Sequence, residues 1–174
     1  PTVAALEEKL ATMEGGRGGT VTSSGHAAET LVLFPLMAPG MEVIVSNKLY
    51  GGTINLMGKS FRKFGWNAVF VDNDNPEAFR AAVTEKTRAI FVESLANPGG
   101  VIVDLEAIAK IAQEAEVPLI VDNTMATPWL CRPFEWGADL VVHSTTKFLC
   151  GQGNAMGGIV IDSGRFPWFG NAKY

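Results

Sequence analysis

Uninterrupted runs of Val, Ile, Leu and Phe recur along the chain and constrain its fold more than any other feature. A strand with one wet face alternates apolar and polar residues, whereas a continuous apolar run indicates burial on both faces. Helical patterns separate the runs, which together predict an α/β domain with a mostly parallel, seven-stranded sheet and helices on both faces. The predicted strands span residues 20–23, 42–46, 67–71, 89–93, 118–122, 139–143 and 158–162.

The helical segments are bounded by residues that are typical of helix ends. Asn75 and Asp104 are expected N-caps, and Pro39-Gly40 is expected to end the helix that starts near Gly25. The expected helices span residues 3–13, 24–38, 50–63, 76–83 and 105–115. On one face of the first helix, the residues whose spacing predicts burial are Val3, Leu6, Leu10 and Met13.

Composition narrows the class of protein. The 174 residues are 47% hydrophobic and 18% charged, which is typical of one compact domain that buries part of its exterior against partners. A net charge of −4 and the lack of a Lys/Arg block argue against nucleic-acid binding. No apolar stretch has the length of a membrane span, and Cys131 and Cys150 lack metal-ligand spacing. We therefore expect a cytoplasmic protein that has no metal site and no contact with membranes.

Polar groups follow several predicted strands at the point where each strand ends. In sheets of this kind ligands bind at the carboxyl ends of the strands, so these groups are the candidate site. They are Ser23-Ser24-Gly25, Glu93-Ser94, Asp122-Asn123-Thr124 and Ser144-Thr145-Thr146-Lys147.

Two of these groups suggest a covalently held ligand that carries a phosphate. Lys147, flanked by Ser144 and Thr146, is placed to offer an amine for covalent chemistry beside a bound anion. Gly25 would expose backbone N–H groups at a helix N-terminus, where a phosphate is favoured. Taken singly, Lys147 could equally be a surface lysine and Gly25 an ordinary strand–helix turn.

A carboxylate at the end of the preceding predicted strand, residues 118–122, suggests what the ligand is. Asp122 closes an apolar strand and would need a cationic partner such as a protonated pyridine nitrogen, although a helix cap or a salt bridge would also satisfy it. Tyr50 offers a flat face for a ring, or packs on the sheet. Asn97 can reach a phenolic oxygen, or serves the turn at Pro98. With Lys147 and a phosphate cradle, these groups form the constellation that pyridoxal 5'-phosphate requires.

The same residues resemble a known family, the Cys/Met-metabolism pyridoxal-phosphate enzymes. The motifs that carry the resemblance are Ser23-Ser24-Gly25, Tyr50-Gly51-Gly52-Thr53, Glu93-Ser94-x-x-Asn97-Pro98, Val121-Asp122-Asn123-Thr124 and His143-Ser144-x-Thr146-Lys147. Five ordered motifs spread over essentially the whole chain make the resemblance specific. It implies the aspartate-aminotransferase-like fold, also called fold type I.

The resemblance also implies roles for individual residues. Lys147 would form the Schiff base and act as a general base, Asp122 would pair with the pyridine nitrogen, and Tyr50 would stack on the ring and assist proton transfer. The remaining cofactor-binding positions that it implies are Gly25, His26, Glu93, Asn97, Thr124, Ser144 and Thr146. His26 stands where the family often has methionine, and its backbone N–H survives that change.

Within the family, the segments 123–133 and 160–168 look most like O-acetylhomoserine sulfhydrylases. That resemblance implies replacement of the acetyl group of O-acetylhomoserine by sulfide or a thiol, giving homocysteine or methionine plus acetate. It further implies a homotetramer built as a dimer of dimers. A cystathionine γ-synthase and a cystathionine or methionine lyase are the alternatives of the same fold.

Two interpretations of another class remain open. Residues 151–158 superficially look like a glycine-rich nucleotide loop, but Gly-x-Gly-x-x-Gly is not met and a strand follows in place of a helix. The second alternative is a fragment that binds the cofactor but catalyses no reaction. The family resemblance supports this second alternative, because it implies that residues 1–174 form only the large cofactor-binding domain. The family's N-terminal Tyr-x-Arg arm and its C-terminal domain would lie outside this chain.

Overall fold

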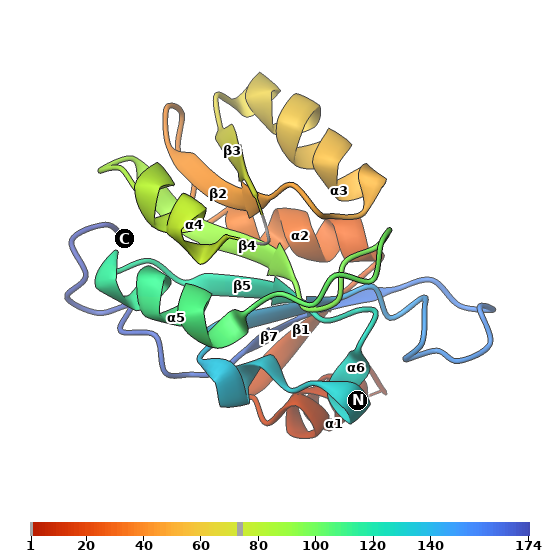
Figure 1. The fold of residues 1–174 in the computed structure, drawn as a ribbon. Coiled ribbons are helices and arrows are strands. Elements are labelled where there is room, and N and C mark those ends of the chain that lie inside the picture. The colour runs from red at the N-terminus through yellow and green to blue at the C-terminus, as the bar shows by residue number, and fades with distance from the viewer. Residues whose placement is uncertain (1, 73–74) are drawn as a thin grey trace.

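A seven-stranded sheet forms the centre of the molecule (Figure 1). The computed structural model describes residues 2–72 and 75–174, so Pro1, the start of the expected domain, lies outside the described residues. The strands are β1 (Gly18–Thr22), β2 (Glu42–Ser46), β3 (Asn67–Val71), β4 (Thr87–Glu93), β5 (Leu119–Asp122), β6 (Leu140–His143) and β7 (Gly158–Asp162). Three of them, β2, β3 and β7, have the predicted bounds.

The strands lie in the order β1-β7-β6-β5-β4-β2-β3. The pairs β3–β2, β2–β4, β4–β5 and β5–β6 are parallel, whereas β7 pairs antiparallel with both β6 and β1. The mostly parallel sheet of seven strands is therefore confirmed. Since β4, β5 and β6 run side by side in one direction, their carboxyl ends meet at one edge of the sheet.

Helices cover both faces of the sheet (Figure 1). The helical elements are α1 (Thr2–Glu14), α2 (Gly25–Leu33), α3 (Gly51–Asn55), the π-helix η1 (Leu56–Ser60), the 3-10 helix η2 (Phe61–Phe64), α4 (Pro76–Ala82), α5 (Leu105–Glu114), α6 (Thr127–Leu130) and the 3-10 helix η3 (Pro133–Trp136). The expected N-caps are confirmed, because the side chain of Asn75 accepts from Glu77 N–H and that of Asp104 from Ala107 N–H. Among the described residues, no helix is long and apolar enough to cross a membrane.

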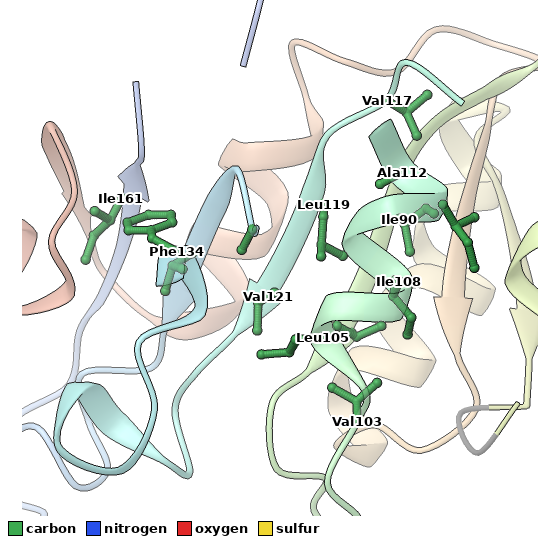
Figure 2. Close-up of a cluster of buried hydrophobic side chains, with 14 of the residues drawn as sticks. Ile90, Val103, Leu105, Ile108, Ala112, Val117, Leu119, Val121, Phe134 and Ile161 are labelled. Carbon is green, nitrogen blue, oxygen red and sulfur yellow. The ribbon is translucent and has the colours of Figure 1, made fainter. Parts of the chain in front are cut away.

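Two apolar cores explain the continuous runs in the sequence. In β5, Leu119 and Val121 face a core that also contains Ile108 of α5, while Ile120 between them faces a second core with Leu33 of α2. Figure 2 shows the first core, in which α5 packs across β4 and β5. Because alternate residues of one strand enter different cores, both sets must be apolar. A buried Leu or Ile side chain contributes about 1.5–3 kcal/mol.

Two predicted helices differ from the structure in length. The helix expected to reach residue 38 ends at Leu33, since Pro35 has no N–H to donate to the preceding turn. The helix expected over residues 50–63 is α3 followed by the π-helix η1 and the 3-10 helix η2. Gly65, with φ of 75°, ends this segment in the left-handed conformation that glycine favours.

The predicted buried face of the first helix is largely wrong. Of its four residues only Leu10 is buried, and Val3 and Leu6 are 57% and 43% exposed. The helix instead buries Leu10, Ala11 and Glu14. The helix is rotated from the expected orientation because Glu14, at its end, bonds to buried partners in the sheet. Apolar periodicity could not reveal a carboxylate on the inner face.

Candidate cofactor-binding site

The carboxyl ends of β4, β5 and β6 bring the predicted site residues together. Glu93, which ends β4, is paired in register with Asp122, which ends β5. Asp122 is in turn paired with Val142 of β6, and His143 and Ser144 follow directly. The sheet therefore places two carboxyl groups and the segment that leads to Lys147 along a single edge.

Asp122 is partly buried at this edge. Its Oδ1 accepts a hydrogen bond from Thr124 N–H at 2.8 Å, and Thr124 Oγ1 accepts one from Ser144 N–H at 2.8 Å. Burial raises the pKa of Asp122, while the hydrogen bonds with Thr124 and the electrostatic influence of His143 and His26 oppose that rise. The carboxyl thus bonds locally to the Thr124 backbone, as in an Asx turn.

Glu93 organises two other predicted residues through their backbones. One carboxyl oxygen accepts from Tyr50 N–H at 2.6 Å, and the other accepts from Asn97 N–H at 2.9 Å. Burial raises the pKa of Glu93 to about 7, and the negative charge of Asp122 contributes to the rise. The side chains of Tyr50 and Asn97 remain exposed beside this clamp.

The N-terminus of α2 lies against the segment after β6. Ser24 caps α2 by accepting from Ala27 N–H at 3.1 Å. A Cβ on Gly25 would lie 2.8 Å from Ser144 Cβ, so this approach requires glycine. His26, the next residue, has its ring centroid 5.9 Å from that of Tyr50. Gly25, His26, Ser144 and Tyr50 are therefore neighbours, as a shared ligand would require.

Lys147 lies in the turn that follows β6, and its side chain is exposed. Thr146 Oγ1 both donates to Gly157 O at 3.2 Å and accepts from Gly157 N–H at 3.1 Å. The glycine-dense segment therefore folds back onto this turn before β7 begins. A Cβ on Gly158 would lie 2.1 Å from Ser24 O, so the glycines let β7 start against the N-terminus of α2.

Glu29 is a site residue that sequence reasoning missed. It lies on α2, is buried, and accepts a hydrogen bond from Thr53 Oγ1 at 2.7 Å. Burial raises the pKa of Glu29 to about 8, and the charges of Asp122 and Glu93 raise it further. The available signal was a glutamate among the apolar residues of the α2 inner face, between Ala28 and Val32.

The donor set fits pyridoxal phosphate. The charge of Asp122 raises the pKa of both Glu29 and Glu93, and a protonated pyridine nitrogen would offset the cost of holding these carboxyl groups together. Gly25 and Ser144 supply an N–H at a helix start and a hydroxyl for a phosphate. Among the described residues, no group of three or more His, Cys, Asp or Glu is arranged to hold a metal ion.

Comparison with solved structures defines the class of protein. The chain superimposes over its whole length on a Campylobacter jejuni protein described as an O-acetylhomoserine (thiol)-lyase, with a TM-score of 0.98, 40% identity and 43% of that chain covered. That structure contains a pyridoxyl-lysine monophosphate. A protein named metB from Corynebacterium glutamicum matches 94% of the chain, covering 42% of its own length, with a TM-score of 0.91 and 38% identity. The fold is that of the fold type I pyridoxal-phosphate enzymes.

The family follows from the sequence comparison. The family model described as Cys/Met metabolism PLP-dependent enzyme matches residues 1–174, and the chain belongs to this family. It is 48% identical over 174 residues to an O-acetyl-L-homoserine sulfhydrylase of Leptospira meyeri and 44% identical over 169 residues to a homocysteine/cysteine synthase of Saccharomyces cerevisiae. The matches cover 100% and 97% of this chain but 39% and 38% of the relatives. The chain thus spans about two fifths of their length.

Proposed function

We propose that this chain forms the cofactor-binding part of an enzyme that replaces the acetyl group of O-acetylhomoserine with sulfide or a thiol. The observation that supports the proposal is the convergence at one sheet edge of Asp122, the Lys147 turn and the Gly25–Ser144 contact. Relatives named as O-acetylhomoserine sulfhydrylases from several organisms support the choice of substrate.

Each site residue has a definite task in this proposal. Pyridoxal phosphate, when bound, supplies the electron sink that acidifies protons near the substrate amine. Lys147 would hold the cofactor through Nζ and, once displaced by the substrate amine, would take the proton from the α-carbon. Asp122 would keep the ring nitrogen protonated. Backbone N–H of Gly25 and the Ser144 hydroxyl would hold the phosphate, and Tyr50 would lie against the ring.

The remaining predicted cofactor contacts have supporting tasks. Asn97 would donate to the phenolic oxygen, and Glu93 would hold Asn97 and Tyr50 at the spacing that its two backbone contacts set. Thr124 would orient Asp122 and connect it to the Ser144 backbone. His26 and Thr146 would contribute to the phosphate side.

Covalent labelling tests the cofactor assignment. The purified protein is saturated with pyridoxal phosphate, reduced with borohydride and digested, and mass spectrometry then locates the adduct. The expected result is one adduct on Lys147, and none in a Lys147→Arg variant that binds the same phosphate. Lys48, which lies near Tyr50 in the chain, is the internal control. An adduct mainly on another lysine contradicts the assignment.

Turnover assays separate the candidate reactions. O-Acetylhomoserine with sulfide should give homocysteine and acetate, whereas a lyase or a cystathionine γ-synthase would act on cystathionine or form it from cysteine. Cofactor binding without turnover of any of these would favour the non-catalytic fragment. The homotetramer and the cytoplasmic location remain predictions, which sedimentation and cell fractionation would test.

A further inference from the structure

A buried polar network lies directly behind the site residues. Ser94 Oγ donates to Asn123 Oδ1 at 2.7 Å, and Asn123 Nδ2 donates to Glu14 Oε1 at 2.8 Å. The same Glu14 oxygen lies 2.5 Å from His143 Nε2, and both of these side chains are fully buried. Glu14 comes from α1, and the other three members come from the ends of β4, β5 and β6.

Three members of the network are direct sequence neighbours of residues of the candidate site. Ser94 follows Glu93, Asn123 follows Asp122, and His143 precedes Ser144. Successive residues of a strand point to opposite faces, so the site residues and the network share three backbone segments. Any displacement of the network therefore displaces the residues expected to hold the cofactor.

Two atoms of the pair have no hydrogen-bond partner among the described residues, namely Glu14 Oε2 and His143 Nδ1. A buried carboxylate is costly without a counter-charge, and within this contact an imidazolium would provide one. The other titratable side chain that senses Glu14 is Cys131, whose pKa is raised first by burial and then by the charge of Glu14. A thiol supplies no positive charge, so His143 is the group that can balance Glu14.

His143 also acts electrostatically on Asp122. It favours the ionised form of that carboxyl and opposes the effect of burial, as does His26. Glu29 and Glu93 act in the opposite direction, because each of their charges interacts unfavourably with that of Asp122. Glu14, His143 and Asp122 then carry one net negative charge, which a protonated ring nitrogen would neutralise.

We propose that Glu14 and His143 are a buried charge pair that positions His143 as a cation and so keeps Asp122 ionised for the ring nitrogen of the cofactor. This inference rests on the proposed function. Both are positioning residues, since neither needs to contact cofactor or substrate. Glu14→Gln keeps an acceptor for His143 and Asn123 but removes the charge, and His143→Gln keeps a donor for Glu14 but cannot become a cation.

The test follows the absorbance of the bound cofactor as a function of pH in the purified protein. In both variants a less ionised Asp122 should stabilise the protonated ring nitrogen less, so the pyridoxal-phosphate Kd should rise about tenfold. The less positive ring then withdraws fewer electrons from the Schiff-base nitrogen, and the midpoint of the absorbance change, which reports that nitrogen, should rise by about one pH unit. The double variant should resemble either single variant, since the pair acts as a unit. Variants that titrate like the wild type overturn the inference alone, whereas a wild type that binds no cofactor overturns the proposed function as well.

Asp139→Asn is the matched control. Asp139 precedes β6 at the opposite end from His143, is partly buried, and accepts from Leu119 N–H at 2.9 Å. Its substitution removes a partly buried charge near β6 and keeps an acceptor for Leu119 N–H, and the absorbance midpoint should stay unchanged. A midpoint shift in this control as large as in Glu14→Gln would mean that any buried change near β6 has the effect, and would contradict the inference.

A direct measurement needs neither variants of the pair nor cofactor. The chain has two histidines, so long-range ¹H–¹⁵N spectra of the wild type, assigned with His26→Gln, report the ring protonation of His143. Two protonated ring nitrogens at neutral pH support the inference. A neutral His143 ring overturns it, even if the variants fail to fold.

Discussion

Replacing Glu29 with Gln should make the cofactor-free protein more stable at alkaline pH and leave it nearly unchanged at acidic pH. The pKa of Glu29 in the folded chain is about 8, against 4.5 for an ordinary glutamate. The folded state therefore holds a proton that the unfolded state releases above pH 4.5. Stability from this group is fully present below pH 4.5 and is lost as the pH rises through 8.

The size of the effect follows from the same two pKa values. The full loss for one carboxyl is on the order of 5 kcal/mol, at 1.36 kcal/mol for each pH unit between them. Between pH 6 and pH 8 the wild type should lose about 2 kcal/mol relative to Glu29→Gln. The amide can still accept from Thr53 Oγ1, so the hydrogen bond is kept and the difference reports the charge.

Urea unfolding at several pH values and constant ionic strength provides the assay. The control is Glu42→Gln, because Glu42 accepts from Thr84 Oγ1 at 2.7 Å in a similar carboxyl–hydroxyl pair that solvent reaches. Its free energy of unfolding should follow the wild type with a constant offset. If the Glu29→Gln difference also stays constant within about 0.5 kcal/mol from pH 6 to pH 8, the buried carboxyl does not titrate as described and the reasoning is refuted.

Three further variants test separate parts of the structure. Asp122→Asn should weaken pyridoxal-phosphate binding yet stabilise the cofactor-free protein at pH 8, because burial raises the pKa of this carboxyl and its charge costs stability. A variant that loses both cofactor affinity and stability at pH 8 would contradict this reasoning. Gly25→Ala places a Cβ 2.8 Å from Ser144 Cβ, so it should lower the free energy of unfolding by about 1–3 kcal/mol and weaken phosphate binding. In the control Gly51→Ala the new Cβ meets no atom within 4 Å, and the loss of stability in urea unfolding should be smaller. Phe79→Ala, in the core beside α5, should cost about 3–5 kcal/mol in urea unfolding while the adduct still forms on Lys147; loss of the adduct in folded protein would refute the separation of core and site.

Much of the fold could be predicted because its signals are local. The strands β2, β3 and β7 match their predicted bounds. In β2 the apolar run Val43, Ile44 and Val45 is buried, as expected for a strand that is covered on both faces. The caps at Asn75 and Asp104 are readable because each is satisfied within three residues. The end of α2 is also set by a local signal, which is Pro35 and not the later Pro39-Gly40.

The candidate site likewise contains residues that the sequence can predict and one residue, Glu29, that depends on the tertiary structure. Asp122 and Lys147 could be named from the sequence because each follows an apolar strand, and parallel strands carry such positions to one edge. Glu29 could not be named, because its burial and raised pKa depend on Thr53, Glu93 and Asp122 arriving from other elements. Its local signal is weak and consists of a glutamate among the apolar residues of the inner face of α2.

The sequence by itself determined the alternation of strands and helices, the edge of the sheet that carries the candidate site residues, and the family to which the chain belongs. Only the tertiary structure decided which face of α1 is buried, because that depends on Glu14 meeting His143, which lies 129 residues away. Apolar periodicity reports transfer from water and carries no information on a carboxylate whose counter-charge comes from a distant strand. The charge balance behind Asp122 therefore becomes visible only once the chain has folded.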